Sequence, residues 1–110
     1  MQYILVYITA RDKAEAEAIA SAALDKGLAA CANIPGPVHS MYKWEGNLES
    51  GPETVLLLKS RRDLFPALRE EVRRLHSYAT PCIVSLPLLD GDRDFLDWID
   101  ASCTAKPSGD

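Results

Sequence analysis

The chain has 110 residues, of which 47% are hydrophobic and 25% are charged, and its formal net charge is −4. This length fits one domain, and a chain of this composition can bury a core instead of staying disordered. The scattered lysines and arginines argue against nucleic-acid binding, which depends on clustered positive charge. No segment approaches the roughly 20 apolar residues of a transmembrane helix, so we expect no membrane partner.

The first part of the chain predicts a strand followed by a helix. Residues 3–9 are apolar at both alternating sets of positions, which is typical of a strand buried on two faces. Asp12 followed by Glu15 resembles a capping box, in which side-chain oxygens accept from free backbone N–H groups. The alanine-rich residues 14–24 therefore predict a helix, with Gly27 as its C-terminal stop.

The middle of the chain predicts an antiparallel hairpin. Residues 28–34 and 38–44 are expected to be strands, separated by a bend or bulge at the Pro35-Gly36-Pro37 segment. Gly46-Asn47 is expected to lie in a long polar turn, and residues 53–60 form the next strand. His39 is predicted to be an exposed strand residue.

The second half predicts a helix, a strand and a short closing helix. Asp63 is expected to cap the first of these helices, whose apolar residues up to Leu75 follow helical spacing. Residues 83–89 predict the fourth strand, and Asp92 or Asp94 starts the last helix. The order β-α-β-β-α-β plus a helix predicts an α+β, ferredoxin-like domain over 1–103, with a disordered tail at 104–110.

The strands predict that copies of the chain associate. Two helices can cover only one face of a four-stranded sheet, yet several predicted strands are apolar on both sides. Soluble monomers rarely leave such a face in water. We therefore expect a homo-oligomer with closed symmetry.

The cysteines and histidines raise the question of a metal site. Three widely spaced cysteines argue against a disulfide framework and fit reduced thiols in the cytoplasm. Cys31 and Cys82 are predicted to lie on neighbouring strands with His76 close by, a donor set that suits copper(I) or zinc. The alternative is that both cysteines pack in the core and His76 caps a helix end. Cys103, near the C-terminal end, is predicted to have no role.

Several segments, in order along residues 3–101, resemble the CutA divalent-cation tolerance family. The segment 27–34, GLAACANI, is similar to the family strand "lAACvNi", and 40–46, SMYKWEG, is similar to "S-x-Y-x-W-x-G". Residues 53–60 resemble "E-x-x-L-x-x-K-T", 75–81 resemble "H-P-Y-x-x-P-E", and 95–99 resemble "Y-L-x-W-I". The resemblance implies a ferredoxin-like subunit in a trimer similar to the PII signalling proteins. It also implies a cytoplasmic role in tolerance of copper and other divalent metals.

Some positions depart from the family pattern. Ile8 and Leu75 stand where copper-binding members carry a cysteine and a second histidine. Ala79 and Cys82 stand where a glutamate is common, and Ser77 replaces a proline. Of the copper-binding set, only His76 is present in this chain. The expected ligand is copper or another divalent cation, which is not required for folding.

A second set of residues predicts a cleft between subunits. These polar or amphipathic side chains lie in the motif segments and can hold a small anion: Asn33, Tyr42, Trp44, Lys59 and Tyr78. The alternative is interface packing, which Tyr and Trp favour, and Trp98 is expected to pack in the core or an interface.

Three functions follow from these patterns. The first is a metal-binding tolerance protein, and the second is a PII-like sensor or scaffold for a small anion. The third is an enzyme, which the sequence supports least because no nucleophile–base pair is visible. We therefore predict that the chain is not an enzyme.

Overall fold

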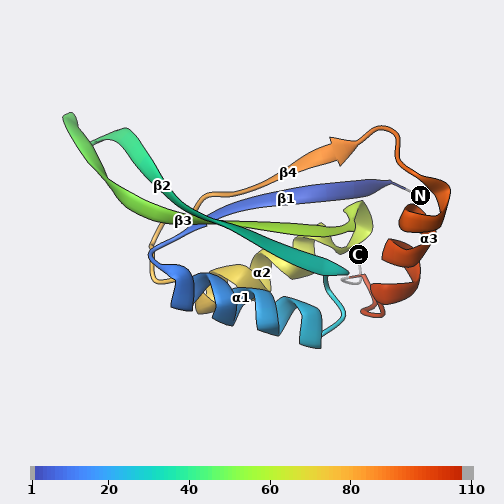
Figure 1. Ribbon diagram of the computed structural model, residues 1–110. Coiled ribbons are helices and arrows are strands. Elements are labelled where there is room, and N and C mark those ends of the chain that lie inside the picture. The colour runs from blue at the N-terminus through green and yellow to red at the C-terminus, as the bar shows by residue number, and fades with distance from the viewer. Residues whose placement is uncertain (1, 108–110) are drawn as a thin grey trace.

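Residues 2–107 are described in a computed structural model as one sheet with three α-helices. The order β-α-β-β-α-β plus a terminal helix confirms the predicted α+β, ferredoxin-like fold (Figure 1). The elements are β1 (Tyr3–Ala10), α1 (Lys13–Asp25), β2 (Cys31–Trp44), β3 (Asn47–Arg61), the 3₁₀ helix η1 (Arg62–Leu64), α2 (Phe65–Leu75), β4 (Ile83–Leu88) and α3 (Arg93–Ser102).

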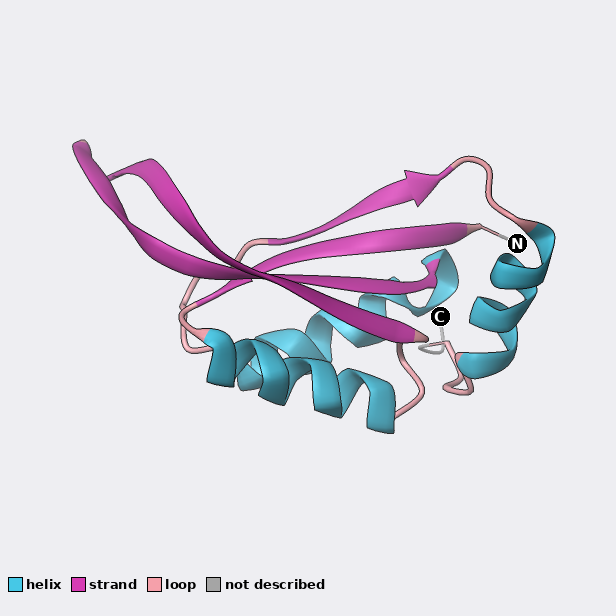
Figure 2. Cartoon of the chain, in the orientation of Figure 1, coloured by secondary structure: helices cyan, strands magenta, loops and turns pink. Residues whose placement is uncertain are grey.

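The sheet has the order β2-β3-β1-β4, and every neighbouring pair is antiparallel. The helices α1 and α2 lie side by side against one face (Figure 2). Alternate residues of the central strands point toward these helices, because side chains on a strand alternate between faces. Ile4, Val6 and Ile8 of β1 thus join Leu56 and Leu58 of β3 in the core.

The ends of α1 follow the predicted signals. The Asp12 carboxylate accepts from the N–H of Glu15 at 2.8 Å, as an N-cap does. At the other end Gly27 has φ +67°, its N–H donates to Leu24 O, and the N–H of Leu28 donates to Ala23 O. This pair of bonds is a Schellman motif, which glycine favours because a left-handed residue with a side chain is strained.

The β2–β3 hairpin is longer and tighter than predicted. β2 is one continuous strand, with the expected bulge between Asn33 and Gly36, and residues 28–30 are not part of it. The predicted long turn at Gly46-Asn47 is wrong, because Trp44 pairs directly with Asn47 across a two-residue turn. Glu45 (φ +50°) and Gly46 (φ +83°) both have the positive φ of a type I′ turn, which matches strand twist.

Beyond the end of β1 the hairpin continues as a free arm. β1 pairs with β3 only as far as Thr54, so residues 38–44 and 47–53 pair only with each other. This hairpin arm projects past the rest of the sheet in Figure 1. Its large apolar side chains are exposed, with Met41 63%, Trp44 55% and Leu48 69% accessible.

The predicted cap of α2 is also wrong. Asp63 lies inside η1, and α2 begins without a side-chain cap after Leu64, with Pro66 in its first turn. The carboxylate of Asp63 instead accepts from Arg61 Nε at 3.0 Å. A nearby guanidinium competes with the helix N–H groups for this carboxylate, and the sequence pattern contained no sign of that pairing.

α3 crosses the end of the sheet where β1 begins and β4 ends (Figure 1). Ile99 and the buried Cys103 pack with Leu64, so Cys103 is part of the core rather than near a loose end. The N–H of Ala105 donates to Gly27 O at 3.1 Å, so the first residues of the predicted tail are packed. Residues 108–110 of that tail lie outside the described residues.

The face of the sheet opposite α1 and α2, which we call the open face, is apolar. It carries Leu5, Tyr7 and Leu57, which are half-buried, and the more exposed Val84 and Leu86 at 50% and 46%. This arrangement agrees with the expectation of a sheet that is apolar on both sides. Among the described helices, none has the length and apolar character needed to cross a bilayer.

Candidate functional site

The loop after α2 contains His76, the histidine predicted as a metal ligand. The side chain is buried, and Nε2 lies 2.8 Å from the carbonyl oxygen of Thr9 at the end of β1. A carbonyl can only accept, so Nε2 carries the proton and donates it. Nδ1 then accepts from the N–H of Tyr78 at 3.1 Å. Both ring nitrogens are therefore occupied, and neither has a lone pair free for a metal.

Glu15 holds the same loop from the side of α1. Its buried carboxylate accepts from the N–H of Arg11 at 2.9 Å and from the N–H of Ser77 at 3.0 Å. Burial raises the pKa of Glu15, but the groups of Arg11, Ser77 and His76 that face the carboxylate outweigh it, so the pKa lies below its ordinary value. The ionised carboxylate thus ties the start of α1 to the loop that carries His76. From the capping pattern alone, Glu15 was expected only to cap α1.

Tyr78 turns from this loop toward the base of the hairpin arm. Its ring packs against that of His76, with centroids 4.7 Å apart. Burial and the facing carboxylate of Glu53 on β3 raise the pKa of Tyr78 to about 12, and Tyr42 contributes in the same direction. Tyr78 therefore faces Glu53, and its phenol stays protonated at neutral pH.

The cysteines predicted as metal ligands lie far apart. They were expected on neighbouring strands, and this is wrong: β2, which starts at Cys31, and β4, which Cys82 precedes, are the two edges of the sheet. Two strands separate them, a spacing of about 14 Å. The split order of a ferredoxin-like sheet places them there, because β4 pairs with β1 and not with β2. Within residues 2–107, no three His, Cys, Asp or Glu side chains gather as a metal set.

Cys31 and His76 are also separated along the strands. Cys31 is level with Lys59 and Leu5, whereas His76 contacts Thr9, four residues farther along β1. Four strand residues span about 13 Å. Cys31 and His76 therefore do not form a nucleophile–base pair within one chain.

Lys59 is the centre of a second cluster, on the open face. Its ammonium donates to Asn33 Oδ1 at 2.7 Å and lies 5.8 Å from the ring centroid of Phe95 on α3. Cys31 is the cross-strand partner of Lys59. No carboxylate within the described residues lies within 4.0 Å of Lys59, so its charge is held by an amide and an aromatic ring alone.

The five residues predicted to line one cleft thus fall into separate groups. Asn33 and Lys59 lie together on the open face near α3. Tyr78 lies near Glu53 at the base of the hairpin arm. Tyr42 pairs with Glu49, farther along the arm. Trp44 is at the tip of that arm, next to its turn. Trp98 is 45% exposed and packs against Phe95 at 5.6 Å between ring centroids, so it lies outside the core of the chain.

The sequence matches a known family along almost its whole length. The profile of the CutA1 divalent ion tolerance protein covers residues 4–102. The chain belongs to the CutA1 family. The divalent-cation tolerance protein CutA of Archaeoglobus fulgidus is 47% identical over 95 residues, which are 86% of this chain and 92% of that protein. The protein of the same name from Thermus thermophilus is 41% identical over the same shares.

Solved CutA structures share the fold. The structure described as the periplasmic divalent cation tolerance protein CutA from Archaeoglobus fulgidus superposes with a TM-score of 0.90 at 44% identity. The alignment covers 92% of this chain and 98% of that one. CutA1 from Oryza sativa gives a TM-score of 0.91 at 33% identity, over 98% and 97% of the two chains. The resemblance to the CutA family is thus confirmed in sequence and in structure.

Proposed function

We propose that this CutA1 family member acts in tolerance of divalent metal ions as a homotrimer in the cytoplasm, and not as an enzyme. The observation that carries the assembly is the open face, whose apolar side chains α1 and α2 leave uncovered. The relatives named above are described as divalent-cation tolerance proteins, which supports the role. An apolar sheet face of this kind is typical of an interface between subunits.

The positions of the cysteines limit how a metal can be held. Both ring nitrogens of His76 are hydrogen-bonded to backbone groups. Of the three predicted metal ligands, this leaves the two cysteine thiols. Cys82 is exposed and Cys31 is half-buried, and both are free. Since they lie at opposite edges of the sheet, a copper(I) or zinc site that uses both requires two copies of the chain.

The test measures assembly and metal binding together. We expect sedimentation of the wild-type chain to give the mass of three copies, and Leu86→Glu on the open face to dissociate it. Leu24→Glu places the same charge on an exposed leucine of α1 and should leave the trimer intact. In calorimetry with copper(I) and with zinc, Cys82→Ser should weaken binding without changing the mass.

Two results would count against this proposal. A wild-type monomer at micromolar concentration would remove the assembly and, with it, the shared metal site. An intact trimer that binds neither copper(I) nor zinc would remove direct metal binding. The role in tolerance would then need another ligand.

The Lys59 cluster supports a second candidate, a sensor or scaffold that binds a small anion between subunits. In the proposed trimer the open face loses its water, and the ammonium of Lys59 has no carboxylate nearby in its own chain. A buried charge without a counter-charge is costly, and a bound anion removes that cost. Inorganic phosphate or citrate should raise the thermal midpoint of the wild type but not that of Lys59→Met. Equal shifts in both proteins would exclude this site.

A further inference from the structure

The arginines of the chain divide into two groups. Four of the seven are ion-paired with carboxylates: Arg11 with Asp12, Arg61 with Asp63 and Asp100, Arg74 with Glu71, and Arg93 with Asp97. The other three are exposed and have no carboxylate within 4.0 Å among residues 2–107: Arg62, Arg69 and Arg73. All three belong to η1 and α2.

The unpaired arginines lie along one line of the helix surface. Arg62, Pro66, Arg69 and Arg73 follow one another at intervals of four, three and four residues, which keeps them on one side of a helix. From Arg62 to Arg73 this stripe extends about 17 Å along the axis. We call residues 62, 66, 69, 70 and 73 the outer stripe.

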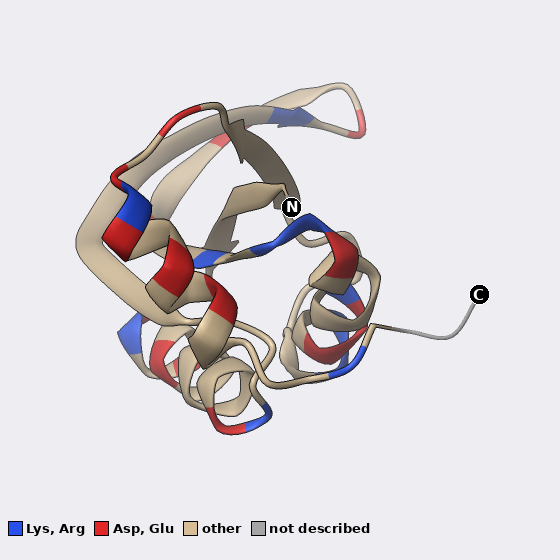
Figure 3. Cartoon of the chain, turned by 90° about the vertical axis from the view of Figure 1, so that its right-hand side faces the viewer, with Lys and Arg blue, Asp and Glu red and all other residues tan. Residues whose placement is uncertain are grey.

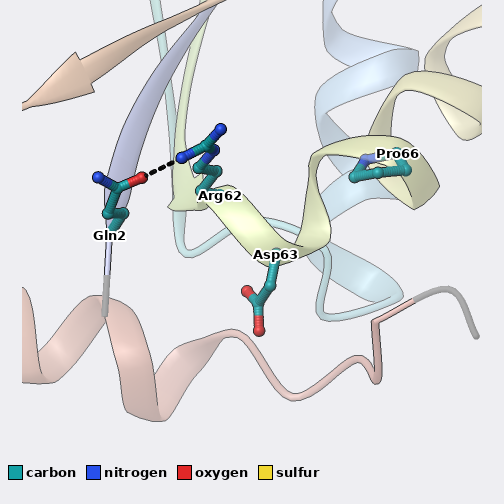
Figure 4. Close-up of a pocket in the computed structure, with 4 residues that line it drawn as sticks. All are labelled: Gln2, Arg62, Asp63 and Pro66. Carbon is teal, nitrogen blue, oxygen red and sulfur yellow. Dashed lines mark hydrogen bonds between the residues drawn. The ribbon is translucent and has the colours of Figure 1, made fainter. Parts of the chain in front are cut away.

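Two hollows lie along the outer stripe. One hollow of about 360 Å³ is lined by Gln2, Arg62, Asp63 and Pro66 (Figure 4). The other, of about 550 Å³, is lined by Arg69, Glu70 and Arg73. Each hollow therefore presents at least one guanidinium group to the solvent.

Neutral groups orient two of these arginines without cancelling their charge. Arg62 Nη1 donates to Gln2 Oε1 at 2.7 Å, as Figure 4 shows, and Arg73 Nη2 lies 3.4 Å from Ala79 O. Asp63, which lines the same hollow as Arg62, is ion-paired with Arg61 instead. An oriented guanidinium with free N–H groups is well suited to bind a carboxylate in two-point fashion.

The outer stripe faces away from the rest of the fold. Leu68 and Val72, on the opposite side of α2, are buried in the core against the sheet. The open face lies on the far side of that sheet, so the proposed trimer leaves the outer stripe in solvent. By contrast, α3 carries three acidic residues, Asp94, Asp97 and Asp100 (Figure 3).

We propose that the outer stripe binds an acidic segment of another protein, in which carboxylates flank a basic residue. The three arginines take the carboxylates, and Glu70, which lies between Arg69 and Arg73, takes the basic residue. Glu70 and the net charge of −4 disfavour nucleic acid, whose phosphates carry no cation to face a carboxylate. Arginine is also enriched in protein interfaces, where its planar group can pair and stack.

Fluorescence anisotropy with the full chain tests this proposal. The probe is a labelled 14-residue peptide with glutamates spaced to meet the arginines and one central lysine. We expect binding that weakens as salt increases. Changing Arg62, Arg69 and Arg73 to glutamine should reduce the affinity by about tenfold or more, because each removes a charge-assisted hydrogen bond.

Matched variants separate this stripe from charge in general. Arg11→Gln with Arg93→Gln removes two exposed but ion-paired arginines and should leave the affinity unchanged. Glu70→Lys should weaken binding of the original peptide. It should strengthen binding of a second peptide in which glutamate replaces the central lysine. The proposal is overturned if the peptide does not bind, if the control pair causes an equal loss, or if a 20-base-pair DNA binds as tightly.

Discussion

At the scale of single residues, His76 shows how context changes the role of a side chain. A lone histidine beside a tyrosine and a proline is compatible with metal binding, and the sequence left this open against a structural role. In the folded chain its two nitrogens join the end of β1 to the loop after α2. Glu15 supports that loop from α1. A buried histidine with two backbone partners positions the chain, and it cannot bind a metal without breaking those bonds.

Glu15 gives a prediction at this scale. Glu15→Ala leaves the N–H groups of Arg11 and Ser77 without their acceptor, and we expect the free energy of unfolding to fall by about 2 kcal/mol. Urea denaturation of the wild type and of Glu15→Ala at neutral pH measures this difference. Glu17→Ala removes an exposed carboxylate from the same helix and should change stability little. Equal losses in the two variants would show that Glu15 does not hold the loop.

At the scale of elements, short-range signals located most boundaries. Asp12 and Gly27 begin and end α1 as predicted, and Asp92 caps α3. The error at Asp63 arises because Arg61, two residues before it, takes its carboxylate from α2, and the same guanidinium also donates to Asp100 of α3. The hairpin turn was predicted at Gly46-Asn47 but lies at Glu45-Gly46, the two residues with positive φ. Residue types alone did not reveal that Glu45 adopts this conformation.

The contact between α1 and α2 predicts a dependence on pH. Glu71 of α2 accepts from Arg74 at 2.6 Å and lies 2.9 Å from Lys26 at the end of α1. Arg74 first, and then Lys26, lower the pKa of Glu71 from 4.5 to about 2. A carboxyl with a lower pKa in the folded state stabilises the protein when ionised. This contribution is therefore complete above the unfolded value and is lost as pH falls toward about 2.

Chemical denaturation between about pH 5 and about pH 2 tests the Glu71 contact. We expect the wild type to lose about 1 kcal/mol more than Glu71→Gln over this range, a modest value because Lys26 and Arg74 are about half exposed. Glu70→Gln, which removes the neighbouring exposed carboxylate, should behave like the wild type. Parallel pH profiles for the wild type and Glu71→Gln would contradict the assignment.

At the scale of the whole molecule, two surfaces remain without partners in one chain. The open face is apolar and lies opposite α1 and α2, whereas the outer stripe of α2 is basic and faces solvent. Association through the open face leaves the outer stripe free. The proposed trimer therefore displays three copies of that stripe, which favours a partner with repeated acidic segments.

The proposed trimer predicts that stability depends on protein concentration. Association stabilises the folded state by mass action, so the thermal midpoint should rise by a few degrees, about 3–8 °C, over a hundredfold increase in concentration. Differential scanning calorimetry at several concentrations measures this. Leu86→Glu should show a lower midpoint that no longer changes with concentration. A midpoint that is constant in the wild type would indicate that folding and assembly are not coupled.

The sequence by itself determined the fold class, the family and the apolar character of both sheet faces. Strand periodicity, helix capping and glycine stops are local, so they can be read from neighbouring residues. Only the tertiary structure decided that Cys31 and Cys82 lie at opposite edges, that Lys59 meets Asn33 and Phe95, and that His76 is closed to a metal. Strand order and side-chain pairing join residues distant in sequence, and local patterns carry no information on which of many partners a side chain meets.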